Sequence, residues 1–154
     1  MNNKKICFAA SSGGHFEQLM MLRPMMDKYS SVVVTEKTKY GTSIKDIKTY
    51  YMMQVNRKEI LCPLKIIINA FNSLKILLIE NPDAIICTGV LAMIPLCLIG
   101  KLWGKKLIYI ESFAKITSPT QSGKFLYKYA DQFYIQWPQM KEFYPEAIYL
   151  GGIY

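Results

Sequence analysis

Short apolar runs alternate along this chain with longer stretches in which apolar residues recur at helical spacing. The run at residues 31–35 contains three consecutive valines, which is typical of a strand buried on both faces of a parallel sheet. The pattern predicts strands at residues 6–10, 31–35, 48–53, 84–87, 107–110, 132–135 and 147–150. It predicts helices at residues 16–28, 64–80, 91–103, 122–130 and 138–143.

Strands that alternate with helices are typical of βαβ units, whose connections cover both faces of a parallel sheet. The sequence therefore predicts an α/β fold, a doubly wound parallel sheet, with residues 1–154 forming a single domain. Ligands of such sheets bind at the carboxyl ends of the strands. Candidate binding segments are the loops at residues 11–15, 36–43, 88–91, 111–121 and 136–138.

Two of the predicted helices carry few polar residues. The stretch 64–79 has only a narrow polar stripe, and the stretch 90–103 has almost no polar face before Lys101. Both could pack in the core, or one could expose its apolar face to a bilayer interface with lysines near the lipid headgroups. Neither run reaches the roughly 20 apolar residues that span a membrane.

Composition places the chain among globular proteins with a cationic surface. Its 154 residues suit about one domain, and 51% hydrophobic with 19% charged residues excludes a disordered segment. The net charge is +8, and Arg23 and Arg57 are its only arginines. A lysine-rich excess fits attraction to an anionic surface better than base readout. No nucleic-acid-binding motif is present, so no nucleic-acid partner is expected.

The cysteines and the single histidine offer no metal site. Cys7, Cys62, Cys87 and Cys97 form no C-x-x-C pair, and His15 is the only histidine. This usage predicts buried, reduced thiols in a cytosolic protein, with neither a metal nor a cofactor. The first apolar run is too short for the hydrophobic region of a secretory signal, so none is expected.

The first strand leads into the turn Ser11-Ser12-Gly13-Gly14-His15, which opens a helix. Glycines allow close backbone approach, and a helix N-terminus offers free N–H groups to a phosphate. His15 could act there as a general base on a hydroxyl or as a donor to a diphosphate oxygen. A structural, helix-capping histidine is the alternative. The spacing differs from the dinucleotide-binding G-x-G-x-x-G pattern.

Other candidate residues follow later strands. Thr88 and Gly89 form a second strand-to-helix turn, and Glu111 and Ser112 follow the fifth predicted strand. Glu111 could orient an acceptor hydroxyl or hold His15, or it could brace its loop. A small, basic, hydroxyl-rich segment then contains residues suited to an anion: Lys115, Ser118, Ser122, Gly123 and Lys124.

Several motifs together carry a family resemblance that covers essentially the whole chain. They are Ser12-Gly13-Gly14-His15, Thr88-Gly89, Glu111-Ser112-Phe113-Ala114, the stretches 122–127 and 130–138, Tyr144-Pro145 and Tyr149-Leu150-Gly151-Gly152. With them the chain resembles the membrane-recruiting subunit of the two-chain UDP-GlcNAc transferase of dolichol-linked oligosaccharide synthesis. It is equally similar to bacterial capsule and exopolysaccharide homologues, called galactosyltransferase enhancer proteins. Because the chain begins almost at its first strand, the bacterial branch and a peripheral attachment are expected.

More distantly, the Gly-Gly-His turn resembles the first glycine loop of the peptidoglycan GlcNAc transferase that makes lipid II. In that enzyme one chain holds both halves of a GT-B fold. The resemblance implies that this chain is the acceptor-side half and that a partner chain supplies the UDP-sugar site. The partner would be recruited to the cytoplasmic face of the plasma membrane, and galactose or GlcNAc would be transferred with inversion to a polyprenyl-diphosphate-linked sugar.

The resemblance also implies roles for individual residues. His15 and Glu111 are the expected catalytic residues, and the C-terminal segment Gly151, Gly152, Ile153 and Tyr154 is expected to dock against the partner. The residues expected to bind the acceptor and its phosphates are Ser11, Ser12, Gly13, Gly14, Thr88, Gly89, Ser112, Lys115, Ser122 and Lys124.

Three other interpretations remain open at this point. The chain could be a non-catalytic membrane scaffold for its partner, or a stand-alone nucleotide-binding module. It could also be a peripheral membrane protein with no role in sugar transfer.

Overall fold

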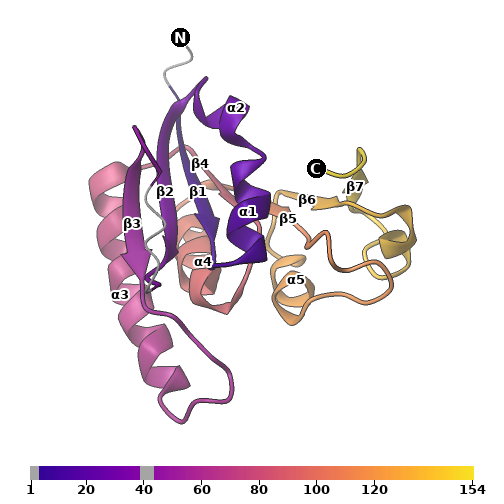
Figure 1. Cartoon of the computed structure of the whole chain (residues 1–154). Coiled ribbons are helices and arrows are strands. Elements are labelled where there is room, and N and C mark those ends of the chain that lie inside the picture. The colour runs from indigo at the N-terminus through magenta and orange to yellow at the C-terminus, as the bar shows by residue number, and fades with distance from the viewer. Residues whose placement is uncertain (1–3, 39–43) are drawn as a thin grey trace.

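The computed structural model describes residues 4–38 and 44–154, and within them the chain forms a seven-stranded sheet, all parallel. The strands are β1 (Lys5–Ala10), β2 (Ser30–Glu36), β3 (Lys48–Met52), β4 (Ala84–Cys87), β5 (Lys106–Ile110), β6 (Gln132–Ile135) and β7 (Ile148–Tyr149). Their order is β3-β2-β1-β4-β5-β6-β7, which runs outwards from β1 in two directions (Figure 1). This confirms the predicted doubly wound fold. Residues 39–43 of the predicted binding loop 36–43 lie outside the described residues.

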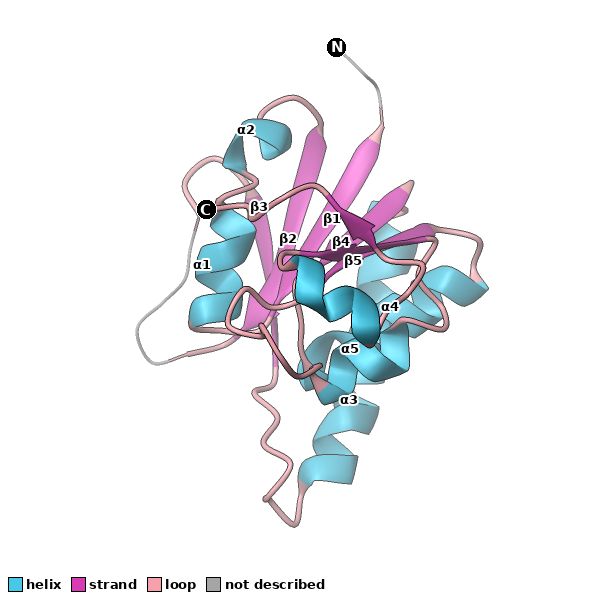
Figure 2. Cartoon of the chain, turned by 90° about the vertical axis from the view of Figure 1, so that its right-hand side faces the viewer, coloured by secondary structure: helices cyan, strands magenta, loops and turns pink. Residues whose placement is uncertain are grey.

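Helices cover the sheet from both sides (Figure 2). They are α1 (Gly14–Met20), α2 (Arg23–Met26), α3 (Cys62–Glu80), η1 (Leu91–Met93), α4 (Ile94–Leu102), α5 (Gln121–Leu126) and η2 (Pro138–Glu142). Successive side chains of β1 point to opposite faces, so Phe8 packs with Leu19 of α1 while Cys7 and Ala9 pack with Leu96 of α4. The two layers of core therefore sit on either side of one buried sheet.

The prediction of one helix over residues 16–28 is wrong. The segment forms two short helices, because α1 ends at Met20 and α2 begins at Arg23. Pro24 lies in the first turn of α2, where its missing N–H costs little, whereas in a continuous helix the same proline would leave a carbonyl one turn earlier without its donor.

Other helices are shorter or tighter than predicted. The first turn of the predicted helix 91–103 is the 3₁₀ segment η1, and the segment predicted at 138–143 is the 3₁₀ turn η2. Helix α5 ends at Leu126 rather than near residue 130. It begins under a side-chain cap, since Thr120 Oγ1 accepts a hydrogen bond of 2.8 Å from the Gly123 N–H.

Helix α3 has one buried side and one exposed apolar side. Two of its polar residues serve the buried side: Asn69 exchanges two hydrogen bonds with the Met53 backbone, at 2.9 and 2.8 Å, and Ser73 bonds back to its own helix. That side packs along α4. The exposed apolar residues of the helix are Leu64, Ile67, Ile68, Phe71, Leu78 and Ile79, and the exposed Ile60 and Leu61 directly precede it. By length and composition alone, the 19-residue helix α3 could cross a membrane. It is longer than the apolar run at residues 64–79 from which the sequence predicts a helix too short to span one.

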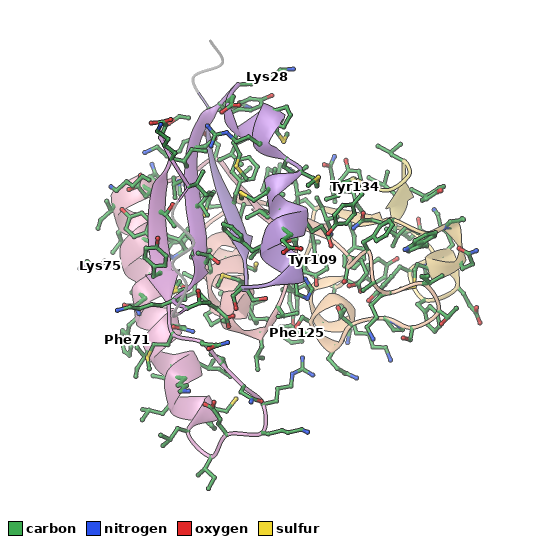
Figure 3. All side chains as sticks on the ribbon, in the orientation of Figure 1. Lys28, Phe71, Lys75, Tyr109, Phe125 and Tyr134 are labelled. Carbon is green, nitrogen blue, oxygen red and sulfur yellow. The ribbon has the colours of Figure 1, made fainter. Side chains whose placement is uncertain are left out.

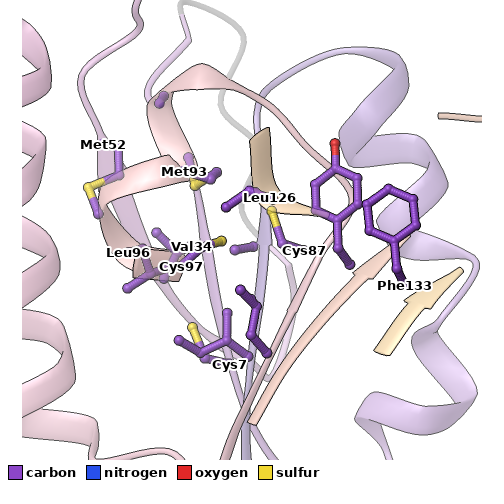
Figure 4. Packing of buried hydrophobic residues seen from close by; sticks show 14 of the residues in the cluster. Cys7, Val34, Met52, Cys87, Met93, Leu96, Cys97, Leu126 and Phe133 are labelled. Atoms are coloured by element: carbon purple, nitrogen blue, oxygen red, sulfur yellow. The ribbon is translucent and has the colours of Figure 1, made fainter. Parts of the chain in front are cut away.

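The cysteines of the core behave as small apolar side chains. Cys7, Cys87 and Cys97 are buried free thiols between the sheet and α4 (Figure 4). Burial raises the pKa of the Cys7 thiol far above its usual range. The predicted buried thiols are therefore confirmed for these three, while Cys62 is half-buried at the start of α3.

Candidate functional site

The candidate site lies where the strand order reverses, between β1 and its neighbour β4. The connections of these two strands leave in opposite directions, which opens a crevice at the carboxyl edge of the sheet. The loops that follow them touch, since Ser11 N donates to the Gly89 carbonyl at 2.8 Å. The structure thus brings together two glycine-bearing turns that are far apart in the sequence (Figure 1).

His15 sits half-buried in the first turn of α1, against the second turn. Its Nδ1 lies 2.7 Å from the Thr88 carbonyl oxygen, and Thr88 Oγ1 donates to the His15 carbonyl at 2.8 Å. A carbonyl oxygen only accepts, so Nδ1 carries the proton of this hydrogen bond. In the neutral ring Nε2 then holds a lone pair, and this nitrogen is the one able to accept a proton.

Gly89 is needed for this arrangement. Its φ of 115° lies in a region that side chains with a Cβ rarely adopt. A Cβ at this position would also lie 3.1 Å from the His15 ring and 3.4 Å from the Tyr109 hydroxyl. The glycine therefore lets the loop after β4 pass close to the imidazole.

Ser12 is not arranged to hold a phosphate. Its N–H and its hydroxyl both donate to Glu36 Oε2, at 3.1 and 3.0 Å, and Glu36 Oε1 accepts from the Val55 N–H at 3.3 Å. Glu36 ends β2 and is only 5% exposed. Its carboxylate uses the donors of Ser12 that the predicted phosphate cradle needs, and it places negative charge beside that turn. The carboxylate therefore argues against Ser12 as a phosphate ligand.

A cavity of about 510 Å³ opens at this edge of the sheet. Its walls come from the loops after β1, β2, β3 and β4, and its lining residues are Ser11, Glu36, Gln54, Val55, Asn56, Arg57, Lys58, Val90 and Leu91. Sequence reasoning missed the segment 54–58. The available signal was Arg57, one of two arginines in a lysine-rich chain, beside Lys58 in the loop after a predicted strand.

Glu111 ends up buried in a hydrogen-bonded cluster of its own. It is 1% exposed, and Oε1 accepts from the Ser112 N–H and from Thr120 Oγ1, both at 2.8 Å. Oε2 accepts from the Tyr144 hydroxyl at 2.7 Å and from the Thr120 N–H at 3.2 Å. Burial and then the bond to Glu111 raise the pKa of Tyr144 well above its usual range.

Gly123 makes room for this cluster, since a Cβ there would lie 2.1 Å from Glu111 Oε2. The Glu111 carbonyl also accepts from Gln136 Nε2 at 2.8 Å and from Gln18 Nε2 at 3.2 Å. These contacts tie the loop 111–120 to α1, α5 and β6. Glu111 therefore braces its loop, which was one of the three roles left open, while His15 Nδ1 is held by the Thr88 carbonyl, and a catalytic role of Glu111 stays a prediction.

The remaining predicted binding residues are spread around the site. Ser122 is buried at the start of α5, and Arg57 Nη2 lies 3.5 Å from its hydroxyl. Lys124 is exposed on α5, whereas Ser112 and Lys115 are half-buried in the loop after β5. The described cavity at the strand reversal is lined by none of these four. Within residues 4–38 and 44–154, no group of three or more His, Cys, Asp or Glu side chains gathers as a metal site.

The C-terminal residues border a second, apolar cavity on the other face of the sheet. On this face, β4, β5 and β6 are flanked by α1 and α2 on one side and by the C-terminal segment on the other. The cavity, of about 300 Å³, is lined mainly by apolar side chains that include Ile86, Ile108, Ile110, Leu150 and Ile153.

Two contacts hold the chain end in place. Ile153 N donates to Gln136 Oε1 at 3.0 Å, and the Tyr154 ring meets the Phe113 ring edge-on with centroids 4.8 Å apart. Phe113 is itself held by Trp137, whose Nε1 donates to the Phe113 carbonyl at 2.6 Å. The last residues are therefore an ordered part of the cavity wall.

Comparisons with known proteins can be set beside this geometry. The family described as "Oligosaccharide biosynthesis protein Alg14 like" matches residues 6–153. The UDP-N-acetylglucosamine transferase subunit ALG14 of Homo sapiens is 41% identical over 79 residues, which cover 47% of this chain and 37% of that protein. The chain thus matches little more than a third of that relative's length. The subunit of the same name from Yarrowia lipolytica is 30% identical over 175 residues, covering 97% of this chain and 81% of that protein.

Solved structures resemble the fold at low sequence identity. MurG of Acinetobacter baumannii superposes with a TM-score of 0.71 and 17% identity, over 88% of this chain and 42% of that one. UDP-N-acetylglucosamine 2-epimerase of Rickettsia bellii superposes with a TM-score of 0.75 and 12% identity, over 99% of this chain and 46% of that one. In both comparisons the whole domain corresponds to less than half of the larger chain.

Proposed function

Because the chain belongs to the family of Alg14-like oligosaccharide biosynthesis proteins, we propose that it is the acceptor-side subunit of a two-chain glycosyltransferase. A donor-binding partner chain holds the UDP-sugar, and this chain binds a polyprenyl-diphosphate-linked sugar and recruits the partner to the membrane. The observation that carries the proposal is the family match over residues 6–153 in a domain that corresponds to only 42% of MurG. A chain of this size supplies one half of a GT-B fold.

The relatives' name points to the first donor to test. They are UDP-N-acetylglucosamine transferase subunits, so UDP-GlcNAc is the first candidate and UDP-galactose, in capsule or exopolysaccharide synthesis, is the second. Transfer from either donor would use the same substitution at the anomeric carbon.

The orientation of His15 supports a role as general base. With Nδ1–H donating to the Thr88 carbonyl, Nε2 is poised to take the proton of the acceptor hydroxyl. The hydroxyl oxygen attacks the anomeric carbon from the face opposite UDP, forms the new C–O bond, and the bond from that carbon to the diphosphate oxygen breaks. UDP leaves with the bonding electrons, and the product is an inverted, β-linked sugar.

The exposed side of α3 supports attachment to the cytoplasmic face of the plasma membrane. Ile60 is 97% and Phe71 is 69% exposed, and Figure 3 shows Phe71 and Lys75 on the outer side of the helix. A helix with one apolar exposed side and nearby lysines, in a chain of net charge +8, suits a bilayer interface that contains anionic lipids. These features support a membrane surface, rather than a soluble partner, as the proposed occupant of this face.

The apolar cavity at the chain end supports the predicted partner interface. Its lining joins Ile153 to the apolar face of β4, β5 and β6, which suits an apolar helix or loop of the donor-binding chain. The predicted docking segment Gly151–Tyr154 thus continues into a larger surface.

Reconstitution of the pair tests the proposal. The chain is co-expressed with the product of the neighbouring gene, and transfer to membrane lipid extract is measured from a panel of UDP-sugars, with each chain alone as control. We expect transfer only with both chains, and the active sugar names the donor. Full activity of this chain alone, or a pair that neither associates nor transfers, would overturn the proposal.

The non-catalytic scaffold is the second candidate, and the Glu111 contacts favour it. One of the two predicted catalytic side chains has both carboxylate oxygens bonded to its own loop and to Tyr144. Transfer that survives the loss of His15 would establish the scaffold. Tight binding of a UDP-sugar without the partner would instead identify a nucleotide-binding module. Vesicle binding with no effect on any transferase would identify a peripheral membrane protein without a sugar role.

A further inference from the structure

The cavity at the strand reversal has two chemically different ends. At one end lie the carboxylate of Glu36 and the hydroxyl of Ser11, both buried. At the other lie the guanidinium of Arg57 and the ammonium of Lys58, both exposed. A ligand that fills such a cavity needs hydroxyls at one end and an anion at the other.

The carboxylate end is suited to a hydroxyl. A carboxylate has about four lone-pair positions, two on each oxygen. On Glu36, Oε2 accepts two hydrogen bonds from Ser12 and Oε1 accepts one from Val55. One position on Oε1 is left for a donor from a ligand, and a sugar hydroxyl supplies it. A phosphate would meet like charge here.

The cationic end is suited to a diphosphate. Arg57 and Lys58 are adjacent in the loop between β3 and α3, and both line the cavity. Arg57 Nη2 also lies 3.5 Å from Ser122 Oγ, at the start of α5. A guanidinium binds phosphate oxygens as a planar fork, and a neighbouring ammonium adds a second positive charge.

An apolar surface begins directly beyond these two cations. Ile60 is 97% exposed and Leu61 is 59% exposed, and both lead into the first turn of α3. Figure 1 shows this start of α3 projecting past the edge of the sheet. A ligand in which a hydrocarbon chain is attached directly to a diphosphate would continue onto this surface, whereas a nucleotide sugar has no such chain.

We propose that this cavity binds the lipid-linked acceptor in one direction, with a sugar hydroxyl on Glu36, the diphosphate on Arg57 and Lys58, and the prenyl chain over Ile60 and Leu61. The inference rests on the proposed function and deepens it. It moves phosphate binding from the turn at Ser12 to the loop at Arg57. It also brings the sugar to the end of the cavity nearest His15, because Ser11 contacts the Gly89 loop on which the imidazole rests.

Binding to three soluble probes tests this direction. The probes are farnesyl diphosphate, farnesyl-diphosphate-linked GlcNAc and UDP-GlcNAc, titrated by calorimetry into the full chain without its partner. The variants are Arg57→Ala/Lys58→Ala and Glu36→Gln. The control Lys128→Ala/Lys141→Ala removes the same charge from exposed positions elsewhere.

We expect the Arg57→Ala/Lys58→Ala variant to bind both farnesyl probes at least about tenfold more weakly, because it loses charge-assisted hydrogen bonds. The control should bind them as the unmodified chain does. Glu36→Gln should weaken only the sugar-bearing probe. Since Glu36 is buried, the ratio of the two farnesyl affinities is read within each variant, so that any loss of folded protein cancels.

Three results would overturn the inference. They are undiminished farnesyl binding by the arginine–lysine variant, an equal effect of Glu36→Gln on both farnesyl probes, and binding of UDP-GlcNAc as tight as that of the lipid-linked sugar. Failure of the unmodified chain to bind either farnesyl probe would instead remove the proposed function itself. The two failures are therefore distinguishable.

Discussion

His15 and Glu111 have opposite surroundings, although sequence reasoning assigns both to catalysis. His15 is half-buried, with one ring nitrogen held by the Thr88 carbonyl and the other able to meet a ligand. Glu111 is buried, and its oxygens accept hydrogen bonds from Ser112, Thr120 and Tyr144. At the residue scale, the hydrogen bonds of Glu111 are those of a side chain that organises its loop, and the catalytic role of His15 stays a prediction.

Replacing His15 tests the first role. In His15→Asn the amide nitrogen can still reach the Thr88 carbonyl, but no atom remains at the position of Nε2. We expect kcat of the reconstituted pair to fall by about 10²–10⁴-fold, which is the usual contribution of a general base. Association with the partner, measured by co-purification, should not change. An unchanged kcat would place the chain among scaffolds.

Replacing the cluster around Glu111 tests the second role. Tyr144→Phe removes one donor to a buried carboxylate and should lower the free energy of unfolding by about 1–3 kcal/mol in urea titrations. Glu111→Gln should lower it at least as much, since Thr120 and Tyr144 then lose a charged acceptor. Transfer per folded chain should stay close to normal in both variants. A large loss of transfer at full stability would show instead that Glu111 acts on the substrate.

At the element scale, helix α3 combines an exposed apolar side with a buried end that is anchored to the sheet. Its outer side is exposed and apolar, while its last residue, Glu80, is buried where the helix meets the strands. The Glu80 carboxylate accepts from Lys5 Nζ at 3.0 Å, from Lys48 Nζ at 2.6 Å and from the Tyr50 hydroxyl. These bonds tie the end of the helix to β1 and β3.

The Glu80 contacts make stability depend on pH. Burial alone would raise the pKa of Glu80, but hydrogen bonds from Lys48, Tyr50 and Lys5 outweigh it and lower the pKa from 4.5 to about 2. The stabilisation is therefore complete above about pH 4.5 and is lost as the pH falls towards 2. Urea unfolding of the unmodified chain and of Glu80→Gln should converge over this range. A constant difference between Glu80→Gln and the unmodified chain over this range would contradict this account.

The outer side of α3 should decide membrane binding. Phe71→Asp places a charge on the exposed apolar side, where one large side chain is worth about 1.5–3 kcal/mol when it is removed from water. We expect at least about tenfold weaker co-sedimentation with vesicles that contain anionic lipid. Leu150→Asp is the matched control, since Leu150 is 81% exposed directly after β7, the edge strand at the other end of the sheet from β3. Equal effects of the two changes would remove α3 as the contact surface.

The two faces of the sheet are covered to different extents. One face is covered by α3, α4 and α5. On the other face α1 and α2 cover β1 and β2, whereas an apolar cavity opens beside β4, β5 and β6. Soluble monomers rarely expose large apolar patches, so we expect the apolar surface beside β4, β5 and β6 to bind another chain. The apolar lining of this cavity therefore supports the proposed partner interface.

The chain end gives the whole-molecule prediction. Ile153 lines the apolar cavity, and Ile153→Asp should abolish co-purification of the donor-binding partner and, with it, sugar transfer. The melting temperature of the isolated chain should change little, because Ile153 is only half-buried. Leu102→Asp, far from this cavity in the fold, should leave the pair intact. A stable pair containing Ile153→Asp would locate the interface elsewhere.

Local pattern was sufficient for the strands and their parallel arrangement, and it places the candidate loops at one edge of the sheet. Residues 84–87 and 132–135 form strands at the predicted positions, because short apolar runs between turn residues have few other solutions. Right-handed crossovers then place the loops after β1 and β4 at one edge. The apolar spacing over residues 16–28 nevertheless predicts one continuous helix where the structure has two. The spacing does not register Pro24, whose missing N–H interrupts helical hydrogen bonding at a single residue.

Only the tertiary structure decided which candidate residues meet. Glu36 reaches Ser12 across 24 positions, Glu111 reaches Tyr144 across 33, and His15 reaches Thr88 across 73. Each contact settles a competition for hydrogen bonds that no local pattern records: the donors of Ser12 go to Glu36, and the carboxylate of Glu111 goes to Thr120 and Tyr144. Arg57 and Lys58 line the cavity for the same reason, because their loop follows β3. In the sheet β3 lies two strands from β1, although 37 residues separate the end of β1 from the start of β3 in the chain. Sequence determined where a site could form, and the packing of distant segments determined its chemistry.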